Sequence, residues 1–197
     1  MAIRGRIRAV LAREEGYSLI ELLTVVTILG LVLSSLTTIF VTASHGELDM
    51  NRRYQAQEEA RLAMDKLRRE IHCASSVSPS GNSSSITLTM PTQCPTSAGA
   101  ASVQWCVQTV SGTRYALYRS TSGTCGAGSG VRWADYLRTQ QVFTYTPQSS
   151  SSLGSLAVAL VVNTTTDPTR GTFKLSDSIV LRNSTRVCIV GSPSPPC

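Results

Sequence analysis

The chain has 197 residues, of which 15% are charged, and a formal net charge of +6. This length allows one hydrophobic core and leaves little room for a second full domain. The charges are unevenly distributed, because residues 22–43 contain no ionisable side chain while residues 47–70 are densely charged with both signs. The average charge and composition of the whole chain therefore describe none of its segments.

A basic segment opens the chain, with four arginines and two glutamates in the first 16 residues. The uncharged residues 22–43 would form a helix about 33 Å long, close to the roughly 30 Å of a hydrocarbon core. This run is long for the apolar part of a secretory signal peptide, and no small-residue cleavage site closes it. We therefore expect a membrane-spanning helix, with the arginines holding the N-terminus in the cytoplasm and the rest of the chain exported.

Glu21 does not fit a plain signal anchor, which is the simpler alternative. An unpaired carboxylate in an apolar run costs a few kcal/mol as it approaches the bilayer centre. A cut between Gly16 and Tyr17 would create a positively charged amine at Tyr17. In a helical array, that amine could meet Glu21 of a neighbouring subunit displaced by one helical turn, about 5.4 Å.

The string Gly16-Tyr17-Ser18-Leu19-Ile20-Glu21-Leu22-Leu23 resembles the cleavage and methylation motif of type IV prepilins and type II secretion pseudopilins. The resemblance implies that a membrane-bound prepilin peptidase cuts after Gly16 and N-methylates Tyr17. Most members of the family have phenylalanine at the position of Tyr17. The resemblance also implies that Glu21 makes an intersubunit contact in a filament.

After the apolar run the sequence predicts a continued helix and then a sheet. Ala60, Met64, Leu67 and Ile71 recur at spacings of four, three and four, which is typical of one helical face. From residue 85 onward apolar residues alternate with polar ones, which predicts strands at 86–90, 103–107, 115–117, 142–145, 156–162, 178–181 and 187–190.

The expected fold class is α+β, with a long N-terminal helix packed on a C-terminal antiparallel sheet. The expected organisation is a cleaved leader, a membrane and filament-core helix, an amphipathic continuation of that helix, and an exported β-rich domain. These segments span residues 1–16, 17–43, 44–76 and 77–197.

The second half of the chain resembles PilW-type minor pilins and J-type minor pseudopilins. The similarity lies in the helical run of residues 60–71, in Leu117-Tyr118-Arg119, in residues 142–145 and in Leu181-Arg182-Asn183. It implies a low-abundance subunit near the filament tip that helps to start assembly. K-type tip subunits usually lack the motif glutamate, so Glu21 argues against that class.

All six cysteines lie in the Ser/Thr-rich part of the chain, which favours disulfides formed outside the cytoplasm. Six cysteines allow 15 complete pairings, and the sequence does not choose among them. Our preferred pairing is Cys106 with Cys125, Cys188 with Cys197, and Cys73 with Cys94.

The leading functional hypothesis is therefore a minor pilin or pseudopilin, which resides in the cytoplasmic membrane and then in an extracellular or periplasmic filament. Its partners would be the peptidase, other pilin subunits and, before assembly, membrane lipid. One alternative is a DNA-binding pilin of an uptake pilus, because residues 73–197 carry a net charge of +5. A second is a pilus-borne adhesin that uses the Ser/Thr/Gly-rich loops. We expect no enzymatic activity, cofactor or metal, since Asp135, Asp167 and Asp177 are scattered and form no calcium loop.

Overall fold

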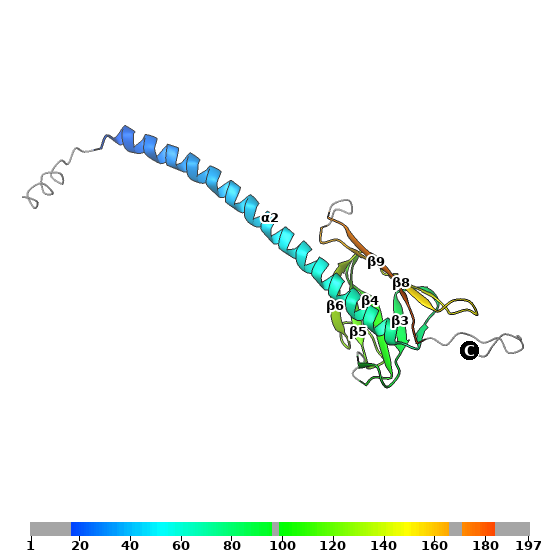
Figure 1. Ribbon diagram of the computed structural model, residues 1–197. Coiled ribbons are helices and arrows are strands. Elements are labelled where there is room, and N and C mark those ends of the chain that lie inside the picture. The colour runs from blue at the N-terminus through cyan, green and yellow to red at the C-terminus, as the bar shows by residue number, and fades with distance from the viewer. Residues whose placement is uncertain (1–16, 96–98, 166–170, 184–197) are drawn as a thin grey trace, which may run out of the picture. The chain divides into compact units, whose positions relative to one another are not determined.

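The computed structural model describes residues 17–95, 99–165 and 171–183. The chain divides into two compact units, Met1–Leu48 and Asp49–Cys197, each of which is described by itself. One helix and nine strands make up the described structure (Figure 1). Gly16, Cys188, Cys197 and the strand expected at residues 187–190 lie outside the described residues.

The helix α2 spans Leu19–Cys73 and has 55 residues. Leucine, alanine, arginine and glutamate are frequent in it and favour helix, and it contains no proline. Ser18 precedes its first residue, and the Ser18 carbonyl accepts the amide hydrogen bond of Leu22 at 3.1 Å. The helix begins after Ser18, a residue type that favours the N-cap position, and the polar Ser75-Ser76 pair follows shortly after its last residue.

All strand pairs in the sheet are antiparallel. Its members are β1 (Ser76–Ser78), β2 (Gly81–Ser83), β3 (Ser85–Thr89), β4 (Ser102–Ser111), β5 (Arg114–Ser120), β6 (Val131–Leu137), β7 (Phe143–Thr146), β8 (Ser155–Val162) and β9 (Phe173–Val180).

The sheet curls, and the first and last strands in its order come from one short segment of the chain. The order is β1-β3-β4-β5-β6-β8-β7-β2, and β9 pairs with β8. Its two terminal strands, β1 and β2, are consecutive in the sequence, separated only by Pro79 and Ser80. Residues 76–83 therefore pair first with β3 and then with β7.

The core lies between the sheet and the part of α2 within the second unit. The predicted stripe of Ala60, Met64, Leu67 and Ile71 is buried, with at most 3% exposure. Alanines on the same face let the helix backbone approach the strands, where Trp105 and Phe143 are fully buried. The expected α+β class, a long helix packed on an antiparallel sheet, is confirmed.

Strand β9 contacts the helix as well as β8. Arg68 forms an ion pair with Asp177 at 2.6 Å, and His72 Nδ1 donates to the Val180 carbonyl at 3.0 Å. The Arg61 guanidinium lies 5.8 Å from the centre of the Phe173 ring. These contacts supply side-chain partners to a strand whose residues are otherwise mostly half-buried or exposed.

The strand predictions were incomplete in three places. Strand β6 was not predicted, because Arg132 and Asp135 interrupt the alternation of apolar residues. The three-residue strands β1 and β2 were also missed, since serine-rich segments favour turns. Strand β9 begins at Phe173, five residues before the predicted start, because it pairs with the full length of β8.

Two disulfides join elements of the second unit. Cys73 at the end of α2 is bonded to Cys94, and Cys106 on β4 is bonded to Cys125. Both pairs belong to the preferred pairing, whose third pair lies outside the described residues. A disulfide that closes a loop of about 20 residues typically contributes roughly 3 kcal/mol.

A buried carboxylate ties the helix to the sheet. Glu70 on α2 is fully buried, and its Oε2 accepts a hydrogen bond from Trp105 Nε1 at 2.8 Å. Its Oε1 accepts from Arg119 Nε at 2.8 Å and lies 3.4 Å from Lys66 Nζ. A buried charge is tolerated only when it is paired and hydrogen-bonded, and Glu70 meets both conditions.

Replacing Glu70 with glutamine keeps the shape of the side chain but removes the charge that faces Arg119. We expect Glu70→Gln to lower the free energy of unfolding by about 3–5 kcal/mol, because it breaks a buried ion pair by removing one partner. Denaturant unfolding followed by tryptophan fluorescence measures this, since Trp105 and Trp133 lie in β4 and β6.

The matched control is Asp65→Asn on the same helix. Asp65 pairs with Arg69, and the Asp65 side chain is 50% exposed. Exposed pairs of this kind contribute at most about 1 kcal/mol. Equal losses in the free energy of unfolding for Glu70→Gln and Asp65→Asn would contradict a special role for the buried carboxylate.

Candidate functional site

The predicted processing motif lies at the start of α2. Tyr17 and Glu21 are exposed, and Glu21 occupies the first turn of the helix. Ser18 and Glu21 have the spacing of a capping box, and a carboxylate in the first turn is favoured by the helix dipole. Within its own chain, Glu21 therefore stands where a helix N-terminus stabilises a negative charge.

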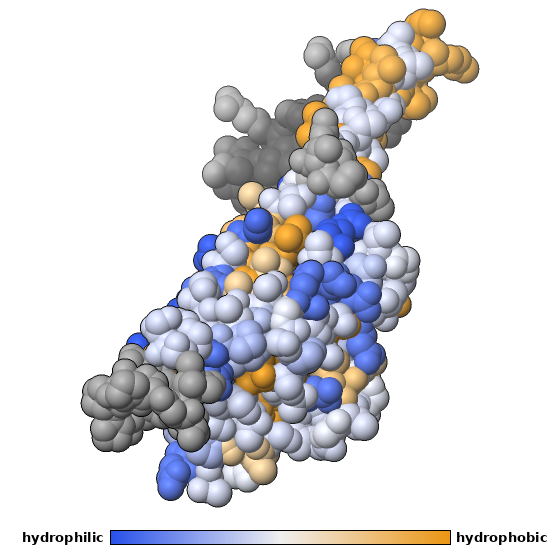
Figure 2. All heavy atoms as spheres, turned by 90° about the vertical axis from the view of Figure 1, so that its right-hand side faces the viewer, coloured by the Kyte–Doolittle hydropathy of each residue, from blue (hydrophilic) through white to orange (hydrophobic). Residues whose placement is uncertain are grey.

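The apolar run that follows is helical throughout and exposed on all sides. Residues 22–43 belong to α2, and each of them is exposed. This helix is long and apolar enough to cross a membrane. Figure 2 shows the difference in character, since hydrophobic residues are frequent in this segment while the visible face of the globular unit is mostly made of polar and weakly hydrophilic residues.

Threonine hydroxyl groups in this run donate hydrogen bonds to backbone carbonyls of the same helix. Each donates to the backbone carbonyl three or four residues earlier at 2.8 Å, as seen for Thr24, Thr27, Thr37, Thr38 and Thr42. Such bonds leave no hydroxyl hydrogen in need of a partner from outside. These threonines are thereby compatible with an apolar environment around the helix.

A second cluster of functional groups lies in the globular unit, between α2 and strands β5 and β6. It surrounds a cavity of about 210 Å³. The helix contributes one wall and the strands contribute the other. The lining residues are Arg52, Gln55, Ala56 and Glu59 from the helix, and Arg114, Arg132, Asp135 and Tyr136 from the strands.

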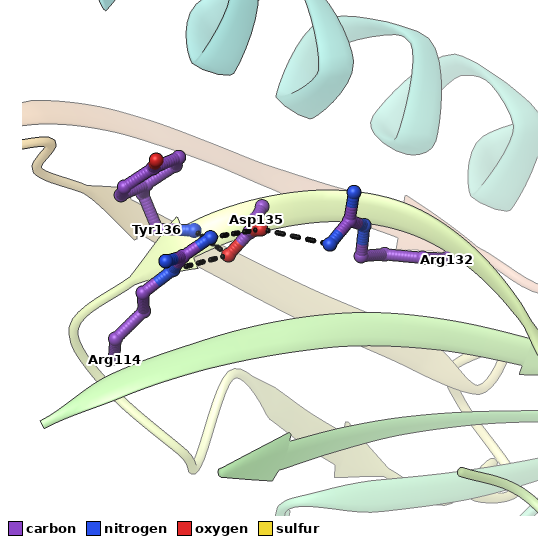
Figure 3. Close-up of polar contacts among 4 residues, drawn as sticks. All are labelled: Arg114, Arg132, Asp135 and Tyr136. Atoms are coloured by element: carbon purple, nitrogen blue, oxygen red, sulfur yellow. Dashed lines mark hydrogen bonds and ion pairs between the residues drawn. The ribbon is translucent and has the colours of Figure 1, made fainter. Parts of the chain in front are cut away.

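Asp135 is the centre of this cluster (Figure 3). It is only 4% exposed, and Arg114 donates to both of its carboxylate oxygens, from Nε at 2.9 Å and from Nη2 at 2.6 Å. Arg132 Nη1 donates to Oδ2 at 3.1 Å, and the Tyr136 amide donates to Oδ1 at 2.6 Å. The carboxylate thus orients two arginines that come from different strands.

Two opposing effects act on the pKa of the Asp135 carboxyl. Burial alone would raise this pKa, because it disfavours the charged form. The hydrogen bonds from Arg114 and from the Tyr136 amide, with the positive charges of Arg114 and Arg132, outweigh burial and lower the pKa below its ordinary value. The hydrogen bond to Asp135 correspondingly raises the pKa of Arg114.

Tyr136 has an unusual backbone conformation beside this carboxylate. Its φ is 58°, in the left-handed region that side chains with a Cβ seldom adopt. The pairing of β5 with β6 is irregular on both sides of Leu117, so the local strand is bulged. The Tyr136 ring packs against the Arg114 guanidinium, 4.0 Å from ring centre to Cζ. Strained residues and bulges of this kind are frequent at functional sites.

The sequence did not indicate this cluster. Asp135 was considered and set aside as an isolated carboxylate, and Arg114 was not singled out. The local signal is weak, consisting only of the three-residue spacing between Arg132 and Asp135. Arg114 is 21 residues from Asp135 in the sequence, and only the β5–β6 pairing brings the two together.

Comparison with protein-family models, with curated proteins and with solved structures found no match in any of the three. Among the described residues, no group of three or more His, Cys, Asp or Glu side chains is arranged to hold a metal ion.

Asp135 makes the free energy of unfolding depend on pH. Its carboxyl has a folded-state pKa below the unfolded value of about 3.9. Its contribution to stability is therefore complete above the unfolded pKa and is lost as the pH falls through the folded pKa. We expect Asp135→Asn to reduce the free energy of unfolding most above about pH 5, with the difference from wild type shrinking below about pH 4.

Unfolding curves at a series of pH values measure this difference. Glu58→Gln is the control, because Glu58 is an exposed carboxylate on the same globular unit. The free energy of unfolding of Glu58→Gln should stay close to that of the wild type at every pH. If the loss of unfolding free energy caused by Asp135→Asn instead grew as the pH fell, the folded-state pKa of Asp135 would lie above its unfolded value, which would contradict this account.

Proposed function

We propose that the chain is a minor pilin or pseudopilin subunit, processed by a prepilin peptidase and assembled into a type IV pilus or type II secretion pseudopilus. The observation that carries this proposal is the first part of α2. It is an exposed apolar helix in which Glu21 is the only charged side chain between residues 17 and 43.

Exposed apolar surface of this extent requires a nonaqueous environment. Residues 22–43 present leucine, isoleucine, valine and phenylalanine side chains all around the helix. Two environments can remove them from water, a lipid bilayer and a bundle of identical helices. A pilin occupies both in turn, first as a single-pass membrane protein and then as a filament subunit.

Glu21 distinguishes a filament subunit from a membrane anchor. The helix N-terminus stabilises the Glu21 carboxylate only in part, and next to an apolar run removed from water this carboxylate also favours a nearby cation. A cut after Gly16 would give each subunit a new cation, the amine of Tyr17. In a staggered array of helices, this amine can pair with Glu21 of the neighbouring subunit.

The second unit supports an exported location. Two disulfides stabilise it, and disulfides persist in oxidising compartments. The arginine-rich segment before the helix favours a cytoplasmic N-terminus, which would place this unit on the opposite side of the membrane. Removal of the leader and assembly would then bring it to the surface of the filament.

No observation on the described residues favours the DNA-binding or adhesin alternatives. Seven of the 12 basic side chains that the structure describes in the globular unit have acidic partners. The paired ones are Arg53, Lys66, Arg68, Arg69, Arg114, Arg119 and Arg132. Their charge is locally compensated, which weakens the field available to attract a polyanion.

Processing provides the direct test of the proposal. The intact mass of the mature protein should match a chain that starts at Tyr17 with one additional methyl group. Gly16→Leu should block the cut, because the peptidase needs close approach to the backbone at that position. A mature N-terminus at Met1, or a cut beyond Ala43, would exclude the prepilin hypothesis.

Glu21 provides the test of assembly. We expect Glu21→Ala to insert into the membrane and to be cut normally, but to enter filaments poorly, because the Tyr17 amine then lacks its partner. Glu21→Gln should be nearly as impaired, since it keeps the shape and loses the charge. Glu21→Asp should be intermediate because its reach is shorter.

The measurement is the fraction of processed protein recovered in sheared filaments. Glu47→Gln serves as the control, because Glu47 is an exposed carboxylate of the same helix outside the apolar run. Equal recovery of wild type, Glu21→Ala and Glu21→Gln would show that Glu21 is not an assembly contact.

A further inference from the structure

The cavity between α2 and strands β5 and β6 is lined by two charged side chains that make no hydrogen bond or ion pair among the described residues, although the charge of one of them, Glu59, acts on Arg114. Arg52 and Glu59 both line it, and neither has a hydrogen-bond or ion-pair partner among the described residues. They are seven residues apart on one helix, about 10.5 Å along its axis, which is too far for a direct ion pair. Glu59 is half-buried, so its carboxylate is partly shielded from water.

The strand side of the cavity supplies further donors. Arg114 is engaged by Asp135 through Nε and Nη2. Arg132 uses only Nη1 for Asp135, and its other N–H groups have no partner within the described part of the chain. The lining therefore offers Arg52 and Arg132 as donors of positive charge, and Glu59 as an acceptor.

The charge and size of the cavity limit what can occupy it. Three arginines face two carboxylates, so the lining has one surplus positive charge. The volume of about 210 Å³ is below the roughly 300–1,000 Å³ of pockets for drug-sized ligands. A single small anionic group fits these limits.

Glu59 decides which anion is suitable. A fully ionised oxyanion such as sulfate has only acceptor atoms and would face the Glu59 carboxylate with repulsion. An oxyanion that retains a proton can accept from Arg52 and Arg132 and donate its O–H to Glu59. At neutral pH, inorganic phosphate and the terminal phosphate of a phosphomonoester retain such a proton in part, whereas sulfate and phosphodiesters have none.

We propose that this cavity is a binding site for a protonated phosphate group, held by Arg52 and Arg132 and selected by Glu59. Arginine forks match phosphate oxygens in geometry and charge. A site that hydrogen-bonds a ligand hydroxyl rejects analogues without it by large factors, because its own polar group is then left unpaired. This site is in the globular unit and does not depend on filament assembly.

Isothermal titration of the full-length protein in neutral detergent at pH 7 tests the site, with inorganic phosphate and sulfate compared at equal ionic strength. Phosphate should bind at least tenfold more tightly than sulfate. Arg52→Gln should weaken phosphate binding at least tenfold. Glu59→Gln should remove the preference, because an amide can donate to sulfate.

Arg61→Gln is the matched control, since Arg61 lies on the same helix and contacts Phe173 outside the cavity. It should bind phosphate as wild type does, and unfolding curves of all variants should show that the globular unit is intact. Glycerol phosphate should bind and dimethyl phosphate should not, which distinguishes a phosphomonoester from a lipid or nucleic-acid diester. Absence of phosphate binding, equal affinity for phosphate and sulfate, or an unchanged Arg52→Gln variant would overturn the proposal.

Discussion

The buried carboxylate of Glu70 determines how the helix lies on the sheet. It accepts hydrogen bonds from Trp105 on β4 and Arg119 on β5, so it sets both the rotation and the axial position of α2. Glu59 and Arg52 precede it by 11 and 18 residues, or about three and five turns at 3.6 residues per turn. They therefore lie on the same helical face, and the cavity near β6 is lined by that face.

One continuous helix carries two chemically different surfaces. Its first part has a single charged side chain, Glu21, followed by an exposed apolar surface, while its second part buries alanines, Leu67 and Ile71 against the sheet. A helix can do both because its backbone hydrogen bonds are internal, so only the side chains need to match the surroundings. The proposed function would depend on the same property, because a pilin subunit moves from a membrane into a filament.

Asp135 has a different role from Glu70 although both are buried carboxylates paired with arginine. Glu70 is fully enclosed and joins helix to sheet, whereas Asp135 lies at a cavity and joins two strands. Arg132, which Asp135 holds through Nη1, also lines the cavity. The strained Tyr136 and the irregular β5–β6 pairing lie next to Asp135, whereas the described β4–β5 register around Trp105 and Arg119 is regular.

The sequence by itself determined the elements that depend on local patterns. The uncharged run of residues 22–43 and the four-three-four spacing of Ala60, Met64, Leu67 and Ile71 predicted the helix and its buried face, because helical periodicity is a property of neighbouring residues. Alternation predicted most of the longer strands, and with them the α+β class. Only the tertiary structure decided where Glu70, Arg114 and Asp135 would lie, since the partners that tie them to other elements are 21 to 49 residues away. Strand order and register determine such contacts, and these depend on the packing of the whole sheet around the helix rather than on any local signal.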